Sequence, residues 1–381
     1  MRAVSMRVYI LENNVRNYFG HFFNTVAGLR TALDQAKVAS RIYIHQQAEP
    51  EVGRQLAARP LFPDHFWESE QAQDAEQAMA TYGQRFAEAL AHVEPPNASD
   101  WLVVTTAFQD QVFGLAAYLE TLAPAERPRV LCYLHWANWQ QHPSRQRAWQ
   151  RACDRIAPHR ATFAAQTEGI ATQFQQLTGQ PASLWPVPMN YGDPGAISPR
   201  PGRSPARVAV LGRSLHRKGS HLLPEIIVRT QLRHPWTRFY IQVSDNMPKL
   251  RHVRHLPGVS IGSGDSRLEA HLQTVREADL LLLPYCPDDY RQRSSGLLME
   301  AAALGRAVVV PDGTWLAAQI ADGRAAGTVF TRQQAPEIAQ ALGQALGMRS
   351  QLAHQAREAA SYWWEHQSAG TFVQRLLAAQ P

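Results

Sequence analysis

The sequence has 381 residues, 45% of them apolar and 18% charged, a balance typical of a globular protein long enough to hold two hydrophobic cores. It contains no run of about 18 apolar residues, so no membrane-spanning helix is predicted. The net charge of +6 is carried mainly by arginine and suits a phosphate-bearing ligand or an anionic membrane face. The charge is too mild and too dispersed to indicate nucleic acid, and a general preference for arginine codons would also produce it.

The first stretch, MRAVSMRVYILENN, has neither the apolar core nor the small-residue cleavage site of a signal peptide. Its segment RVYIL predicts the first strand. The chain has three cysteines, Cys132, Cys153 and Cys286, and no CxxC spacing. An odd number without such spacing is typical of reduced, mostly buried thiols in a cytoplasmic protein.

Strand-like and helix-like segments alternate along the whole chain. After RVYIL comes a loop, then a helical pattern over residues 22–36, and then strand patterns over residues 40–46, 100–107, 129–136 and 161–167. The alternation restarts after Gly202, with strand patterns over residues 206–214, 238–245, 259–264, 279–285, 307–313 and 327–330. Short strands that alternate with longer helices predict parallel sheets, so two such sets predict two doubly wound, Rossmann-like α/β domains.

The boundary between the sets is predicted in a proline-rich stretch that contains a hinge near residues 188–203. We therefore expect a first domain over residues 1–190, a second over residues 191–360, and a terminal helix over residues 361–381. That helix carries the pair Trp363–Trp364, and an apolar stripe is predicted through Trp364, Phe372 and Leu376.

The second domain opens with VAVLGRSLHRKGSHLLPEI. A buried strand ends at Gly212, a basic loop contains Arg213 and Lys218, and a helix begins near Ser220. Ligands of open α/β sheets bind beyond the carboxyl ends of the strands, where helix N-termini favour anions. Lys218 is notable because this chain nearly always uses arginine. The loop therefore predicts a phosphate site, with a plain solvated basic loop as the alternative.

A second candidate site follows the strand pattern DLLLLPY, in the stretch YRQRSSGLLMEAAALGRAVVVP. Ser294 or Ser295 can cap the next helix, and Gly296 keeps the turn open. Glu300 lies one turn further along the same helix face, where a carboxylate can accept two hydrogen bonds from a ribose. The alternative is an acid that only complements the helix dipole.

Together, Arg213, Lys218–Gly219 and the stretch SSGLLMEAAALGRAVVVP resemble the donor-binding motifs of GT-B fold glycosyltransferases, especially the retaining nucleotide-sugar transferases of glycosyltransferase family four. Weaker matches are YFGHFFNTVAGL, TFAAQT and PVPMNYGD. The resemblance implies a GT-B fold, in which two Rossmann-like domains face a cleft and a terminal helix crosses back to the first domain.

The resemblance also implies roles for individual residues. Arg213 and Lys218 would hold the donor diphosphate and stabilise the leaving group, and Glu300 would bind the ribose. Further donor-binding positions are Gly212, Gln292, Ser294, Ser295, Gly296 and Leu297. The family usually has a second glutamate where this chain has Gln292, which can hydrogen-bond a sugar but cannot act as base or nucleophile. The donor sugar and the stereochemical outcome therefore stay open.

The acceptor is expected on the first domain, where the loop ENNVRNYFGHFF and the strand RVLCYLHW end. The acceptor-binding candidates are Asn13, Asn14, Arg16, Gly20, His21 and Trp136. His135 resembles the family histidine that contacts the transferred sugar and is a catalytic candidate beside Arg213 and Lys218. A polar loop, a structural histidine and core tryptophans, Trp139 among them, are the corresponding alternatives.

A basic segment follows, in which Arg147, Arg151 and Arg155 recur every four residues and predict a cationic helix face. Such a face could rest on anionic lipid at the inner side of the cell membrane, although the pattern favours a plain solvated helix face.

The sequence has no DxD triplet, no metal-ligand spacing, no GxSxG and no GxxxxGK[ST] motif. These absences favour metal independence, and the resemblance implies a cofactor-free transferase that moves a hexose from a nucleotide diphosphate sugar to a glycan or lipid-linked acceptor, in polysaccharide or glycoconjugate biosynthesis. One alternative is a nucleotide-sugar epimerase or hydrolase, for which Asp110 is the candidate carboxylate. Another is a binding protein without turnover, which Gln292 would favour.

Overall fold

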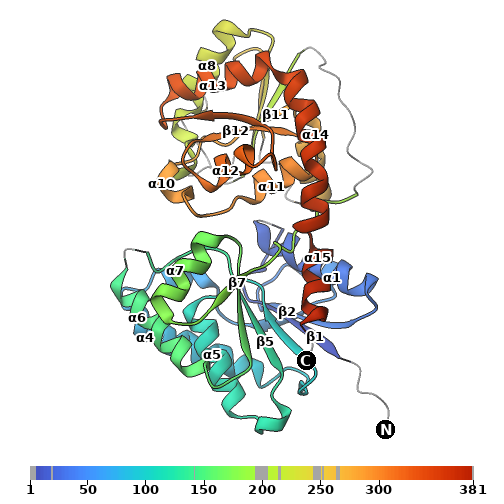
Figure 1. The fold of residues 1–381 in the computed structure, drawn as a ribbon, viewed down its shortest axis with the longest axis vertical. Helices are drawn as coiled ribbons and strands as arrows, with labels where there is room; N and C mark the ends of the chain where they lie inside the picture. Colours follow the sequence, from blue (N-terminus) through green and yellow to red (C-terminus); the bar gives the residue numbers. More distant parts are fainter. Residues whose placement is uncertain are drawn as a thin grey trace. The chain divides into compact units, whose positions relative to one another are not determined.

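The computed structural model describes residues 6–18, 20–140, 142–193, 205–212, 216–242, 250, 253–262 and 267–379. The chain divides into two compact units, and each is described by itself. The first comprises Met1–Asn190 together with Ala369–Pro381, and the second comprises Tyr191–Ser368. In both units helices cover the two faces of a sheet (Figure 1). The predicted hinge near residues 188–203 is described only as far as residue 193.

The first unit is built on a seven-stranded parallel sheet with the order β3-β2-β1-β4-β5-β6-β7. Its strands are β1 (Arg7–Glu12), β2 (Ala39–His45), β3 (Arg59–Phe62), β4 (Trp101–Val104), β5 (Arg129–Leu134), β6 (Ala161–Ala165) and β7 (Ala182–Leu184). The sequence missed β3 and β7, which form the two edges. They are short and mostly exposed or half-buried, so they lack the apolar run that identifies a central parallel strand.

The helices of the first unit are α1 (His21–Gln35), α2 (Pro50–Leu56), α3 (Phe66–Glu70), α4 (Ala75–Leu90), α5 (Gln109–Glu120), η1 (Pro124–Glu126), α6 (Pro143–Ile156), α7 (Glu168–Thr178) and α15 (Ala369–Ala378). Helix α1 buries Phe23, Val26, Leu29 and Leu33, the helical spacing predicted for residues 22–36. Helices α4 and α5 touch backbone to backbone, because a Cβ on Gly114 would lie 2.4 Å from the carbonyl oxygen of Gly83.

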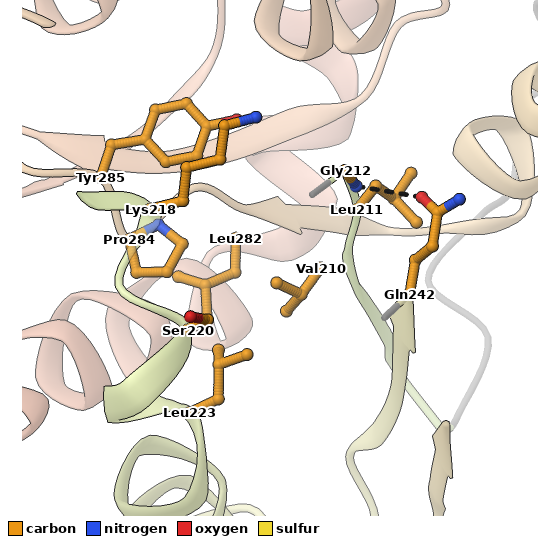
Figure 2. Close-up of a pocket in the computed structure, with 10 residues that line it drawn as sticks. All are labelled: Val210, Leu211, Gly212, Lys218, Ser220, Leu223, Gln242, Leu282, Pro284 and Tyr285. Carbon is orange, nitrogen blue, oxygen red and sulfur yellow. Dashed lines mark hydrogen bonds between the residues drawn. The ribbon is translucent and has the colours of Figure 1, made fainter. Parts of the chain in front are cut away.

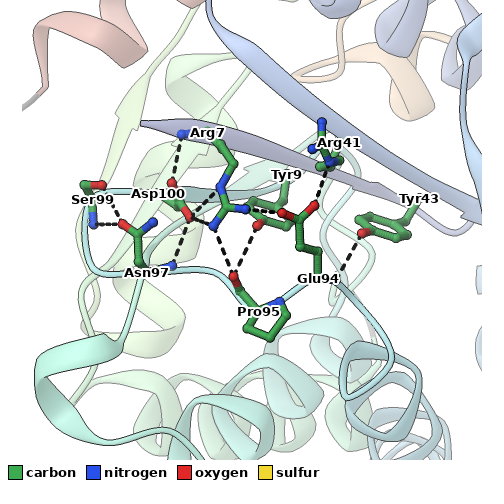
Figure 3. Close-up of polar contacts among 9 residues, drawn as sticks. All are labelled: Arg7, Tyr9, Arg41, Tyr43, Glu94, Pro95, Asn97, Ser99 and Asp100. Carbon is green, nitrogen blue, oxygen red and sulfur yellow. Dashed lines mark hydrogen bonds and ion pairs between the residues drawn. The ribbon is translucent and has the colours of Figure 1, made fainter. Parts of the chain in front are cut away.

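An ionic cluster joins the amino ends of β1, β2 and β4 (Figure 3). The buried Asp100 carboxylate accepts hydrogen bonds from the Arg7 amide at 2.8 Å and from its guanidinium at 2.9 Å. Glu94 accepts from both Arg7 and Arg41, the latter at 2.8 Å, and its amide donates to the Tyr43 hydroxyl. Because ligands of such sheets bind at the opposite, carboxyl ends of the strands, this cluster stabilises the fold rather than forming a site.

The second unit is built on a six-stranded parallel sheet with the order β10-β9-β8-β11-β12-β13. Its strands are β8 (Arg207–Val210), β9 (Arg238–Gln242), β10 (Val259–Gly262), β11 (Leu280–Leu282), β12 (Ala307–Pro311) and β13 (Gly327–Phe330). Its helices are η3 (His216–Lys218), η4 (Ser220–Leu222), α8 (Leu223–Arg233), α9 (Leu268–Glu277), α10 (Pro287–Tyr290), α11 (Gly296–Ala303), α12 (Trp315–Ala321), α13 (Ala335–Gly347) and α14 (Arg349–His366). All six strands coincide with predicted strand patterns.

The C-terminal segment differs from its prediction. The sequence predicts one helix from residue 361, whereas the structure has two, α14 and α15, which belong to different units. The indole of Trp363 donates to the Arg324 carbonyl at 2.6 Å and that of Trp364 to the Ala303 carbonyl at 2.8 Å, so α14 packs on α11. The apolar stripe keeps its helical spacing across the break, which is why the pattern did not reveal it.

Helix α15 completes the first unit beside α1. Phe372 is fully buried between Tyr133 and Trp185, with ring centroids 5.8 Å and 5.1 Å away. The Ala369 amide donates to the Met189 carbonyl at 3.2 Å. The last helix is therefore packed into the first unit. Among the residues described, no helix is both long and apolar enough to span a membrane.

We expect Phe372→Ala to lower the stability of the first unit by about 3–5 kcal/mol, because it leaves a cavity between two aromatic rings. Hydrogen exchange followed by mass spectrometry should show faster exchange in peptides from α1 and β5 but not from β12. The control is Val329→Ala, a 40% exposed position on β13, which should change stability by less than about 0.5 kcal/mol. Unchanged exchange in α1 would contradict the packing of α15.

Candidate functional site

A pocket lies at the carboxyl ends of β8, β9 and β11 in the second unit (Figure 2). It is lined by Val210, Leu211, Gly212, Lys218, Ser220, Leu223, Gln242, Leu282, Pro284 and Tyr285. Two of the predicted donor-binding residues, Gly212 and Lys218, are therefore in one place. Arg213, predicted to act beside them, lies outside the described residues.

Gly212, in the loop after β8, packs close to the first turn of α11. Its φ is +91°, a left-handed conformation that favours glycine, and a Cβ there would lie 3.3 Å from both Lys218 Nζ and Leu297 Cδ1. The Gly212 amide donates to the side-chain oxygen of Gln242 at 3.0 Å (Figure 2). Gln242 ends β9 and was not predicted as a site residue, because the sequence pattern there shows only a strand.

Lys218 and Gly219 both contact the chain after β11. Gly219 has φ +69°, and a Cβ there would lie 2.1 Å from the Pro284 carbonyl oxygen, so this turn packs directly on the chain after β11. The Lys218 ammonium lies 5.3 Å from the centroid of the Tyr285 ring, a cation–π distance (Figure 2). The loop after β8 is thus anchored with its lysine beside the pocket.

The N-terminus of α11 is capped by Ser295, whose hydroxyl accepts from the Leu298 amide at 3.4 Å. This selects between the two predicted caps, since Ser294 is buried just outside the helix. Gly296 and Leu297 are partly exposed at the first turn, and Gln292 is partly exposed before it. The first turn of α11 lies near Lys218, since the Leu297 side chain and the Lys218 ammonium both approach Gly212, and a helix N-terminus with a cation close by can bind an anion.

Glu300 is buried on α11 and forms an ion pair that the sequence did not predict. Its Oε2 lies 2.7 Å from Nε2 of His271 on α9, and the two side chains are 8% and 20% exposed. Burial alone would lower the pKa of His271, but the Glu300 carboxylate outweighs this, so the pKa of His271 is raised. No local motif around His271 indicated the contact, because α9 and α11 are separated by a strand.

The carboxyl end of β1 in the first unit is organised by a second buried carboxylate, Glu12. It accepts from the Asn14 amide at 3.0 Å, from the Asn14 side chain at 2.6 Å, and from the hydroxyls of Thr105 and Thr106 at 2.7 Å and 2.6 Å. Burial raises the pKa of Glu12 while these hydrogen bonds lower it, and the net direction is upward. Glu12 therefore ties the loop after β1 to the loop after β4.

Two of the predicted acceptor-binding residues take part in the same loop structure. Asn13 donates to the Asp64 carbonyl at 3.0 Å, and Asn14 accepts from the Phe66 amide at 3.0 Å. Both are under 5% exposed, so an acceptor would reach them only after these bonds break. Arg16 is partly exposed and pairs with Glu68 at 2.9 Å.

His21, His135 and Trp136, predicted from separate segments, do come together. Gly20, with φ +87°, leads into α1, where the His21 ring lies 4.5 Å from that of His135 and 6.2 Å from that of Trp136. His135 is 5% exposed, with Nε2 2.7 Å from the Thr105 carbonyl. By contrast, Trp139 is buried against Trp149 and Phe174, as the core-tryptophan alternative predicted.

The predicted cationic face lies on α6 but is compensated by acids. Arg147 and Arg151 both pair with Glu76, at 2.7 Å and 3.0 Å, and Arg155 bonds to Glu120 at 2.8 Å. These pairs support the solvated-face interpretation, since each arginine already has a carboxylate partner.

Asp110, the candidate carboxylate for an epimerase or hydrolase, lies in the first turn of α5 and is 5% exposed. Burial raises its pKa to about 7, and Asp64 and Glu70 add to the increase. Its carboxyl is therefore as deeply buried as the His135 side chain, and the epimerase or hydrolase alternative stays a prediction.

The cysteines form no disulfide, and two of them are buried as expected, whereas Cys286 is partly exposed. Across the residues that the structure describes, no three His, Cys, Asp or Glu side chains group as metal ligands would.

Comparison with solved structures identifies the fold class as GT-B, the two-unit fold of many glycosyltransferases. A glycosyltransferase from Rickettsia africae matches with a TM-score of 0.69 and 10% identity, over 99% of this chain and 98% of that one. The likeness, at this identity, establishes the fold alone. No protein-family model matches the chain, and no curated protein matches its sequence.

Two further neighbours were solved with nucleotides or nucleotide sugars. Anabaena HepE, in complex with UDP and glucose, matches with a TM-score of 0.65 and 14% identity over 98% of both chains. A structure described as trehalose-6-phosphate from E. coli bound with UDP-2-fluoro glucose matches with a TM-score of 0.67 and 11% identity over 98% of both chains.

Gly219→Ala should destabilise the second unit more than Gly313→Ala. Both glycines have positive φ, at +69° and +66°, but no atom lies within 4 Å of a Cβ at Gly313, whereas a Cβ at Gly219 meets Pro284. The left-handed conformation costs both variants about 1–2 kcal/mol, and the clash should add about 1–3 kcal/mol for Gly219→Ala alone. Urea unfolding of the two variants measures the difference. Equal losses would show that the turn does not depend on its contact with Pro284.

Asp110 should make the stability of the first unit fall with rising pH. In the folded protein its pKa is about 7, against an ordinary pKa of 3.8, so the folded state binds more protons between these pH values and loses relative stability as pH rises. The loss is at most about 4 kcal/mol from pH 4 to pH 8. Asp110→Asn should flatten this dependence, whereas exposed Asp154→Asn should not. Urea unfolding at several pH values tests it, and parallel curves for wild type and Asp110→Asn would contradict it.

Proposed function

We propose that the protein is a glycosyltransferase that takes a sugar from a nucleotide diphosphate sugar bound at the pocket of the second unit. The observation that carries the proposal is the convergence of Gly212, Lys218 and Leu297 at one point, beside the capped first turn of α11. A cationic side chain and a helix N-terminus at the carboxyl edge of a parallel sheet are a combination suited to a diphosphate.

The donor diphosphate would lie between the Lys218 ammonium and the first-turn amides of α11. These groups face the charge that develops on the diphosphate when the anomeric C–O bond breaks, so they favour the transition state over the bound donor. Glu300, further along α11, would accept hydrogen bonds from the ribose hydroxyls. Gln292, Ser294 and Ser295 lie before the helix start, and of these Gln292 is proposed to bond a sugar hydroxyl. Arg213 is proposed to add a second cation, by the family resemblance alone.

The Gly212 amide would join this site only after a rearrangement. It now donates to Gln242, so a phosphate oxygen that accepts from Gly212 must displace the Gln242 side chain. The released amide would then find its partner in the donor. We infer that the Gln242 side-chain oxygen lies where a phosphate oxygen of the donor would accept from Gly212.

We propose that the acceptor binds the first unit beside His21, His135 and Trp136. An indole and an imidazole can pack against a sugar ring while polar edges bond its hydroxyls. The proposal has further parts. The donor carries a hexose, the acceptor is a glycan or lipid-linked, and transfer proceeds with retention at the anomeric carbon by front-side attack. The reaction needs no metal or cofactor and belongs to polysaccharide or glycoconjugate assembly. They follow from the family resemblance, and the neighbours solved with UDP or UDP-2-fluoro glucose make UDP-glucose the first donor to test.

Lys218→Ala should reduce donor turnover by about 100- to 1,000-fold, because a charge that stabilises the leaving diphosphate is lost. Release of UDP from UDP-glucose, with and without candidate glycan acceptors, measures turnover. A thermal-shift panel of UDP, GDP and ADP identifies the base. Arg233→Ala, an exposed arginine on α8 in the same unit, is the matched loss of one charge and should behave as wild type.

Three outcomes would contradict the proposal in different ways. No stabilisation of folded wild type by any of the three nucleotides would remove the donor site. Nucleotide binding without product from any donor and acceptor would indicate a binding protein, the role that Gln292 favours. Equal losses in Lys218→Ala and Arg233→Ala would show that general charge, rather than the Lys218 position, matters.

A further inference from the structure

The carboxylate proposed to bind the ribose already has a partner. Glu300 Oε2 lies 2.7 Å from His271 Nε2, and the Glu300 side chain is 8% exposed. An ionised carboxylate is costly to bury unless it is hydrogen-bonded. His271, on the neighbouring helix α9, supplies such a bond, and it comes from an element that contributes no other residue to the proposed donor site.

This contact also restricts the direction in which the carboxylate faces. The last torsion of a glutamate side chain is broad, so an unpartnered carboxylate can rotate about it. A hydrogen bond to one oxygen selects one plane for the group. A carboxylate has about four lone-pair positions on its two oxygens, so it can accept from His271 and from two hydroxyl groups together. The two hydroxyls of a ribose lie on adjacent carbons and require acceptors in a fixed relation.

We propose that His271 is a positioning residue that fixes the Glu300 carboxylate for a ribose diol, so that the site selects ribonucleotides over nucleotides that lack these hydroxyls. The proposal rests on the proposed donor site and adds to it the group that sets sugar selectivity. His271 does not need to touch the ligand, because it acts through Glu300. It plays the part that a hydrogen-bonding partner behind a metal-ligating histidine plays in orienting that ligand.

The test compares nucleotides with and without the diol. Calorimetry gives the dissociation constants of UDP, GDP and ADP and of their 2′,3′-dideoxy analogues for wild type, His271→Ala, His271→Gln and Glu300→Gln. Wild type should prefer the ribonucleotide that it binds by at least about 10-fold, since hydrogen bonds to a charged group are lost in the analogue. His271→Ala should reduce this preference by about 10-fold and leave binding of the dideoxy analogue within about twofold of wild type.

Two further variants separate positioning from a general structural effect. His271→Gln keeps an N–H donor and should recover most of the preference, whereas Glu300→Gln should abolish it. His354→Ala is the matched control, because His354 and Glu358 form an exposed His–Glu pair 3.5 Å apart on α14 of the same unit. It should bind both nucleotides as wild type does. Circular dichroism and thermal unfolding check that each variant is folded.

The results that would overturn the inference differ from those that would overturn the donor site. If His271→Ala weakens both nucleotides equally, or changes neither, His271 does not position Glu300 for the diol. If His271→Ala tightens binding of the ribonucleotide, His271 competes with the ribose instead of orienting its partner. If wild type binds none of the six nucleotides, the proposed function fails and the inference fails with it.

Discussion

The parallel arrangement of both sheets is the constraint on which the other features depend. Because every strand of a sheet runs in the same direction, all carboxyl ends, and the helix N-termini that follow them, meet at one edge. In the second unit this edge gathers Gly212, Lys218 and the start of α11. In the first unit it gathers the loop after β1, His21 and His135. At the opposite, amino ends of the strands in the first sheet, Arg7 and Asp100 form an ion pair.

Glu12 and Glu300 are buried carboxylates near these edges, and their partners indicate different roles. Glu12 receives neutral donors, namely hydroxyls and amides from its own and neighbouring loops, and no titratable partner is among them. Such a network holds loops in place. Glu300 is paired with His271, a titratable group whose pKa it raises. A titratable partner on a neighbouring helix suits a carboxylate that also serves a ligand.

The packing of α14 holds in place α11, the helix that begins at the proposed site. Trp364 donates to the Ala303 carbonyl at the end of α11 and contacts Tyr191 with ring centroids 5.5 Å apart. Helix α11 is only eight residues long, so it depends on packing rather than on its own helix propensity. Trp364 therefore supports the C-terminal end of the helix that carries Glu300 and leaves its N-terminus at the carboxyl ends of the strands.

The sequence by itself determined the alternation of strands and helices, the two sheets and the glycine-bounded loops, because apolar periodicity and glycine positions are local signals. It identified Lys218, Ser295 and Glu300 as belonging to loops or helix starts at strand ends. The edge strands β3 and β7 escaped it because exposure removes the apolar pattern.

Only the tertiary structure decided which groups meet. His271 bonds to Glu300 and Gln242 bonds to the Gly212 amide, although the members of each pair are far apart in sequence. Helix α15 belongs to the first unit, although it directly follows α14 of the second. The tertiary structure also turned the arginines of α6 into ion pairs and placed Trp139 and Asp110 inside the core. A local sequence pattern indicates which chemistry a residue is capable of. Its burial and its partners depend on other elements that the sheet brings together, and such contacts leave no signal within a single segment.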